Sequence, residues 1–259
     1  MRTDDTGRRL AVYPAGHGAV PVLLEAGLTD PADIWKDVQH GVATFTRVCS
    51  YDRPGRGQSD PAPTPRTCED LVVDLECVLS ACGGGGPFVL VGHSFGGLVT
   101  LRFAQRHPDA VAGLVFVDSS HPRQMESILK TISRQPSAEN HSLGRYRDRL
   151  VAMFRDPTLN WEGIDIGASM REVKPPAPLG DFPVAVLTAD SVFHDLEIDP
   201  QSVGGLTGTW RCLQAEFTTL SPRVLARVVP GSTHYVFRSH AQDVVEAIRW
   251  VVRESSAGH

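Results

Sequence analysis

Short, continuous apolar runs alternate with longer amphipathic stretches along most of the chain. The runs are rich in β-branched residues, a pattern typical of strands buried on both faces of a parallel sheet. Six runs predict core strands, at residues 20–25, 47–52, 87–92, 111–118, 182–188 and 224–229. In addition, residues 8–15, "RRLAVYPA", indicate an antiparallel edge strand.

Three stretches between or after these strands have the spacing of amphipathic helices. They are residues 68–82, residues 95–107 and residues 240–255, the last of which carries a clear apolar stripe. The alternation of strands and helices predicts an α/β fold class with a mainly parallel, doubly wound sheet.

Residues 121–180 interrupt this rhythm, because they separate two predicted strands by far more than the usual connection of about 2–6 residues. The segment contains helix-like pieces and ends in a proline-rich stretch. We therefore expect a helical cap at residues 121–180, inserted into a core formed by residues 1–120 and 181–259.

Composition narrows the class of protein. The 259 residues carry a net charge of -5, and no basic run indicates nucleic acid or anionic lipid as a partner. Five cysteines without a C-x-x-C pair favour a reducing compartment. Residues 1–10 have no apolar segment, so we expect no signal peptide, and no stretch reaches the roughly 20 apolar residues of a membrane span. We expect a cytoplasmic protein without a membrane span. Histidines and cysteines lack the spacing of a metal site, so we expect neither metal nor cofactor.

The motif "GHSFG" at residues 92–96 carries the first sign of chemistry, since it fits G-x-S-x-G between a predicted strand and a predicted helix. Glycines two positions on either side of Ser94 let the strand and the helix approach each other. The serine hydroxyl then stands at the carboxyl edge of the sheet, beside the free N–H groups that begin the helix. The alternative is a glycine-rich turn whose serine caps the helix.

A serine hydroxyl requires a general base to act as a nucleophile. Of the ten histidines, His234 follows the last predicted strand and precedes the last helix, at the same sheet edge as Ser94. The alternative is an exposed loop histidine. The base in turn needs an acid at that edge. Asp118 and Asp190 each end a predicted strand, and Asp195 lies in the loop after the second of these.

Together with these motifs, residues 50–60, "SYDRPGRGQSD", and residues 103–120, "FAQRHPDAVAGLVFVDSS", resemble the α/β-hydrolase superfamily over essentially the whole chain. The chain is similar in particular to small, capped bacterial esterases and lipases. In many members the acid falls at the position of Val192, which cannot serve. Some members, including the haloalkane dehalogenase group, place it where Asp118 stands, so we favour Asp118 over Asp190 and Asp195.

The loop after the first buried strand departs from the family pattern. Members often carry His-Gly there, whereas this chain has "EAGL" at residues 25–28. The resemblance implies that the N–H groups of Leu28 and Phe95 form the oxyanion hole, since backbone donors do not depend on the missing histidine. For Glu25 we expect a structural role, with Arg53 as its candidate partner.

The resemblance implies a serine hydrolase that cleaves an ester or thioester of an apolar small molecule through an acyl-enzyme, with Ser94, His234 and Asp118 as a catalytic triad. Two alternatives stay open. The same triad serves acyl transfer, cyclisation or release of a carrier-bound chain when water is excluded. Other members of the fold are non-catalytic binding or accessory proteins. No heptad or edge pattern indicates an oligomeric state.

Overall fold

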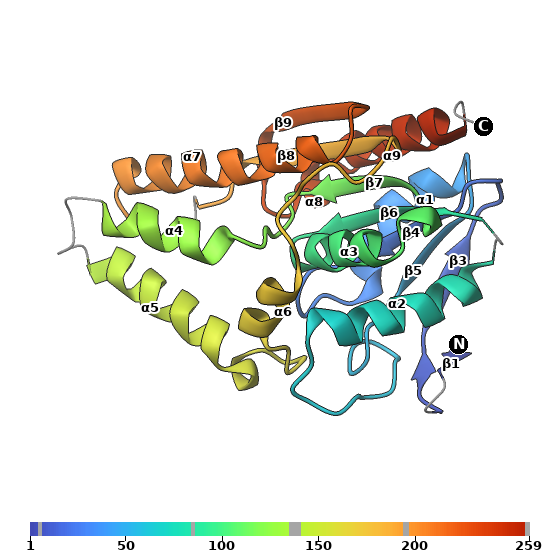
Figure 1. Ribbon diagram of the computed structural model, residues 1–259, viewed down its shortest axis with the longest axis horizontal. Helices are drawn as coiled ribbons and strands as arrows, with labels where there is room; N and C mark the ends of the chain where they lie inside the picture. The colour runs from blue at the N-terminus through green and yellow to red at the C-terminus, as the bar shows by residue number, and fades with distance from the viewer. Residues whose placement is uncertain (5–6, 84–85, 135–140, 194–196, 257–259) are drawn as a thin grey trace.

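A seven-stranded sheet forms the centre of the computed structural model, which describes residues 1–4, 7–83, 86–134, 141–193 and 197–256 (Figure 1). In chain order its strands are β3 (Val12–Ala15), β4 (Val22–Glu25), β5 (Val48–Tyr51), β6 (Phe88–His93), β7 (Val111–Val117), β8 (Val184–Ser191) and β9 (Val224–Thr233). They lie in the order β3-β5-β4-β6-β7-β8-β9, and β3 pairs antiparallel with β5 whereas the other pairs are parallel. A separate antiparallel pair consists of β1 (Arg2–Thr3) and β2 (Arg9–Leu10).

Helices cover both faces of the sheet, which explains why the strands read as continuous apolar runs. The covering helices are α1 (Lys36–Ala43), α2 (Cys68–Cys82), α3 (Phe95–Arg106) and α9 (Ala241–Ser256). Neighbouring residues of one strand join opposite apolar clusters: Leu23 of β4 packs with α2 and α3, and Leu24 packs with α1 and α9. The fully buried residues of β6, β7 and β8 alternate in the same way.

Short helical turns complete the connections. They are η1 (Ala32–Trp35), η2 (Pro108–Ala110), η4 (Phe217–Leu220) and α8 (Val236–Ser239).

The segment between β7 and β8 is helical, as its length suggested. It contains α4 (Gln124–Ser133), α5 (His141–Arg155), η3 (Pro157–Leu159) and α6 (Ile166–Glu172). In Figure 1, α4 and α5 extend to the left of the sheet, whereas α6 lies beside α2. Ile166 and Met170 of α6 belong to the same buried cluster as α2 and α3. The boundaries of a cap at residues 121 and 180 stay a prediction.

A long helix that the pattern did not predict follows β8. This helix, α7 (Pro200–Glu216), packs Leu206 and Trp210 against Ile128 and Ile132 of α4. It begins at an Asp199-Pro200 pair, in which the Asp199 carboxylate accepts a hydrogen bond from the Ser202 N–H at 2.9 Å. Aspartate before proline is a helix-start signal, and this pair is the sequence feature that could have predicted α7.

The fold class is confirmed, with all six predicted core strands in the sheet. Of the antiparallel edge strand predicted at residues 8–15, only residues 12–15 join this sheet as β3, because Arg9 and Leu10 pair with β1 instead. The predicted helix at residues 68–82 has the observed bounds of α2, because Thr67 and Asp70 form a capping box at its start. The other two predicted helices correspond to α3 and α9 within one residue at each end. Within the described part of the chain, no helix is long and apolar enough to cross a membrane.

Gly113 of β7 offers a test of how tightly α9 packs on the sheet. A Cβ at this position would lie 2.3 Å from Cγ1 of Val251 and 3.0 Å from the Pro183 carbonyl oxygen. We expect Gly113→Ala to lower the free energy of unfolding by about 1–3 kcal/mol, measured by urea denaturation, because the buried site cannot expand freely.

Gly208→Ala is the matched control. Gly208 is an exposed residue of α7, and an alanine methyl group there would meet no described atom within 4 Å beyond its chain neighbours and its own helix backbone. Alanine should raise stability at this position by about 0.5–1 kcal/mol through helix propensity. Equal effects of the two substitutions would contradict the packing described for β7 and α9.

Candidate active site

Ser94 stands on a strained turn between β6 and α3. Its backbone has φ +50° and ψ -123°, and its side chain makes no hydrogen bond to the first N–H groups of α3. The alternative of a helix-capping serine is therefore wrong. The flanking glycines permit the turn: a Cβ at Gly92 would lie 2.5 Å from the Gly97 Cα, and one at Gly96 would lie 2.4 Å from the Ala26 carbonyl oxygen.

His234 follows directly on β9 and contacts the Ser94 side chain. Its Nε2 lies 3.0 Å from the Ser94 Oγ, and its Nδ1 lies 2.6 Å from Oδ2 of Asp118. Because a carboxylate only accepts hydrogen bonds, the proton is assigned to Nδ1, which leaves Nε2 free to accept from the serine hydroxyl. The predicted serine and histidine thus meet at one edge of the sheet.

The buried side chain of His93 contacts the backbone of His234. Its Nε2 lies 3.0 Å from the His234 carbonyl oxygen, an acceptor, so this nitrogen carries the proton. Burial is the main cause that holds the pKa of His93 well below its ordinary value, and the ring is neutral. This hydrogen bond fixes the backbone of His234 in the loop that follows β9.

Asp118 directly follows β7 and is fully buried, with a positive φ of +43°. Besides His234, its carboxylate accepts two hydrogen bonds on Oδ1, from the Ala189 N–H at 2.9 Å and from the Trp210 Nε1 at 2.8 Å. Three donors therefore compensate the burial of this carboxylate and fix its orientation toward His234.

The other two candidate acids have different positions. Asp190 turns to the surface, where its carboxylate pairs with Arg211 at 2.9 Å and accepts from the Gly231 N–H at 3.0 Å. Asp195 lies outside the described residues. Among the residues that are described, Asp118 is the carboxylate in contact with His234.

The loop after β4, which carries Leu28, lies against the start of α3, because Gly96 approaches the Glu25 and Ala26 carbonyl oxygens. Phe95 is the first residue of α3, where N–H groups lack partners within the helix. No hydrogen bond involves the Leu28 N–H within the described part of the chain. Glu25 is buried, and Arg53 donates from Nη1 to its Oε1 at 2.6 Å, so the expected partner is confirmed.

Two residues of α7 that sequence reasoning missed hold the end of β7. Trp210 donates to Asp118, as described above. Gln214 is buried and bonds both backbone groups of Ser119: its Nε2 donates to the carbonyl at 2.7 Å and its Oε1 accepts from the N–H at 3.2 Å. Only the Asp199-Pro200 signal could have led to these residues, through the helix that carries them.

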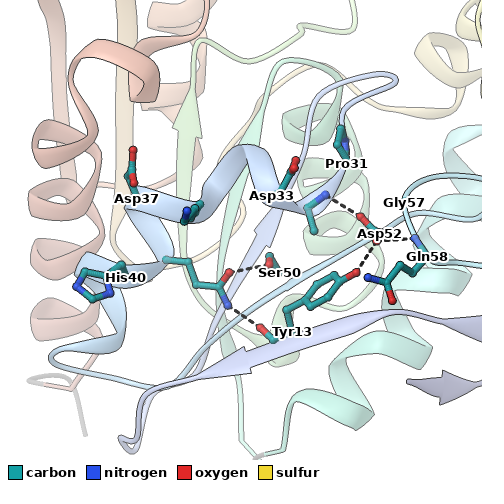
Figure 2. Close-up of a pocket in the computed structure, with 12 residues that line it drawn as sticks. Tyr13, Pro31, Asp33, Asp37, His40, Ser50, Asp52, Gly57 and Gln58 are labelled. Carbon is teal, nitrogen blue, oxygen red and sulfur yellow. Dashed lines mark hydrogen bonds between the residues drawn. The ribbon is translucent and has the colours of Figure 1, made fainter.

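A pocket of about 540 Å³ lies away from these groups, beside α1 and Tyr13, and neither Ser94, Asp118 nor His234 lines it (Figure 2). Asp52 at its wall accepts from the Tyr13 hydroxyl at 2.8 Å, the Ala32 N–H at 2.8 Å and the Gln58 N–H at 2.9 Å. Burial, with help from Asp52, raises the pKa of Tyr13 to about 12, so its hydroxyl stays a donor. These bonds hold the loop at residues 52–60 rather than presenting free groups to a ligand.

Comparison with known proteins extends this picture. The sequence profile of the alpha/beta hydrolase family matches residues 17–247. The chain is 28% identical to lipase LipV of Mycobacterium tuberculosis over 218 residues, which are 81% of this chain and 80% of the relative. Four other curated relatives are matched over only 18%, 40%, 42% and 41% of their own lengths.

Solved structures share the fold. A thermophilic esterase from Thermogutta terrifontis superimposes with a TM-score of 0.63 at 23% identity, over 98% of this chain and 97% of the esterase. A putative lipase from Acinetobacter baumannii gives 0.68 at 17% identity, over 100% of this chain and 91% of the lipase. The family profile spans most of the chain, and the sheet order and the strained serine turn agree with it: the chain belongs to the alpha/beta hydrolase family.

Proposed function

We propose that the chain is a serine hydrolase that cleaves an ester or thioester of an apolar small molecule. The observation that carries the proposal is the continuous contact from Ser94 through His234 to the buried Asp118, at 3.0 and 2.6 Å. The order of these contacts and their distances support Ser94 as nucleophile, His234 as base and Asp118 as acid in acyl transfer.

The reaction begins when the Ser94 Oγ attacks the carbonyl carbon of the substrate. His234 accepts the hydroxyl proton at Nε2 and then gives it to the leaving group as the tetrahedral intermediate collapses. Asp118 stabilises the imidazolium and keeps its ring in position. Trp210 and the Ala189 N–H hold the acid itself, through its other oxygen.

The oxyanion of the intermediate lies against the N–H groups of Leu28 and Phe95. Each donor of this kind contributes about 3–4 kcal/mol to the transition state in well-studied enzymes. The loop of residues 25–29 supplies the first donor and the start of α3 supplies the second. A water molecule, activated by His234, then releases the acyl group and regenerates Ser94.

Apolar side chains favour an apolar acyl group. Leu28, Met125, Met153 and Phe154 are partly buried and pack on the cluster that includes Phe95. Met125, Met153 and Phe154 come from the segment at residues 121–180, which we propose as the cap over the acyl group. The names of relatives, a lipase and an esterase, agree with an ester substrate.

Labelling with a fluorophosphonate tests the nucleophile. Intact mass should show one adduct on the wild-type chain and none on Ser94→Ala, because phosphonylation requires an activated serine. Ser80→Ala, which changes an exposed serine of α2, should label like wild type. An adduct that persists in Ser94→Ala would sink the proposal.

A second prediction separates the two acids. Asp118→Asn should lower kcat by about 10³–10⁴, because the amide no longer holds the imidazole tautomer and its charge. Asp190→Asn should leave kcat within about threefold, since Asp190 pairs with Arg211 at the surface. The rates are measured on p-nitrophenyl esters of increasing acyl length. Near-normal activity of Asp118→Asn would show that another residue serves as the acid.

Trp210→Phe should lower the free energy of unfolding by about 1–3 kcal/mol, because it removes one donor from a buried carboxylate. It should also reduce kcat, since the acid is held less firmly. Trp161→Phe is the control and should change stability by under about 0.5 kcal/mol, because Trp161 is 85% exposed. Urea denaturation measures both, and equal stability of the two variants would remove the role assigned to the indole N–H.

A further inference from the structure

Three charged side chains are buried together beside the loop at residues 25–29. Arg53 is 1% exposed and lies between Glu25 at the end of β4 and Glu162, which follows η3. Its Nη1 donates to Glu25 at 2.6 Å, and its Nε and Nη2 donate to the two oxygens of Glu162, each at 2.7 Å. Burying two carboxylates and one guanidinium has a large desolvation cost, so stability alone does not explain the cluster.

The cluster also binds the backbone on both sides of Leu28. Arg53 donates from Nη1 to the Ala26 carbonyl oxygen at 2.7 Å, and from Nη2 to the Gly27 carbonyl oxygen. Glu162 accepts from the Thr29 N–H. Arg53 and Glu162 together thus hold the peptide groups on both sides of Leu28.

The backbone of Thr29, which donates to Glu162, is strained. Its φ is +67°, a left-handed conformation that costs a β-branched residue about 1–3 kcal/mol and persists only where the surroundings impose it. The hydrogen bond to Glu162 is such a constraint. The Leu28 N–H, one residue earlier, is left without a partner within the described part of the chain.

Glu162 is fixed in turn by its own segment. The Asn160 side chain bonds both backbone groups of Ile164, at 2.9 and 3.0 Å. Arg66 of the core forms a parallel bridge with Ile164, and its carbonyl oxygen accepts from the Asp165 N–H at 2.8 Å. Burial alone would raise the pKa of Glu162, but Arg53 and the Thr29 N–H lower it below its ordinary value, which keeps the carboxylate charged.

We propose that Glu162 is a positioning residue for the oxyanion hole. It holds Thr29 directly and the Ala26 and Gly27 carbonyls through Arg53, so the Leu28 N–H faces the substrate oxygen only while the segment around Glu162 is seated on the core. The segment between β7 and β8 thereby contributes to catalysis as well as to covering the substrate. This inference rests on the proposed function.

The test compares an ester with its thionoester, p-nitrophenyl butyrate and p-nitrophenyl thionobutyrate, in wild type and Glu162→Gln. Sulfur accepts hydrogen bonds poorly, so the hole contributes much less to the thionoester reaction. Glu162→Gln should lower kcat/KM for the ester by about 10- to 100-fold, mostly through kcat, and for the thionoester by less than about threefold. The ester-to-thionoester ratio should therefore fall at least about threefold.

Two further variants frame this result. Glu172→Gln is the control: Glu172 ends α6 on the same segment, and its carboxylate accepts from the Glu69 N–H at 3.1 Å rather than from residues 25–29. The ratio should stay at the wild-type value. Glu162→Asp keeps the charge but shortens the side chain by one methylene, and it should lower the ratio in the same direction as Glu162→Gln.

If Glu162→Gln folds and lowers kcat/KM for both substrates by the same factor, or for neither, the ester-to-thionoester ratio is unchanged. This result would overturn the inference while leaving the proposed function intact. If Glu162→Gln does not fold, Glu162→Asp decides in its place. Failure of both to fold, with Glu172→Gln folded, would assign Glu162 to folding and also overturn the inference. Failure of the proposed function is recognised separately, by wild-type protein that lacks a Ser94-dependent adduct.

Discussion

The close approach of β4, β6 and α3 is the constraint on which the rest of the site depends. Gly92 and Gly96 let the helix begin within contact of two strand ends, and Ser94 takes its strained backbone as a result. The strain is local, but β6 and α3 are buried at the centre of the molecule and impose it. A side chain at Gly96 would push α3 away from the loop that carries Leu28, and one at Gly92 would push β6 away from α3.

Parallel strands then bring distant parts of the chain to the same edge. Asp118 follows β7 and His234 follows β9, so residues more than a hundred positions apart meet at a carboxyl end. The helix α7 adds rigidity, since Trp210 and Gln214 tie its buried side to the end of β7. Its packing on α4 connects Asp118, through Trp210, to the segment between β7 and β8.

Local patterns predicted the strands, the serine turn and His234, because each depends on a short stretch and its neighbours in the chain. The choice between the candidate acids was different, because Asp118 and Asp190 both end predicted strands. The family resemblance favoured Asp118, but only the three-dimensional path shows that Asp118 turns inward to His234 and Asp190 outward to Arg211. In α7 three glycines weaken helix propensity, and packing of Leu206 and Trp210 overrides them. Glu162 has no sequence signal at all, since its partner Arg53 lies 109 residues away.

The buried cluster of Glu25, Arg53 and Glu162 limits how segments of this chain can be exchanged with those of relatives. Arg53 belongs to the core and Glu162 to the segment between β7 and β8, so the two parts are not independent modules. A chimera that receives this segment from a relative without a carboxylate at the position of Glu162 would leave the guanidinium short of a partner, at a cost of about 3–5 kcal/mol. Recombination that exchanges this segment therefore has to move Arg53 and Glu162 together, or replace Glu25, Arg53 and Glu162 with an apolar set.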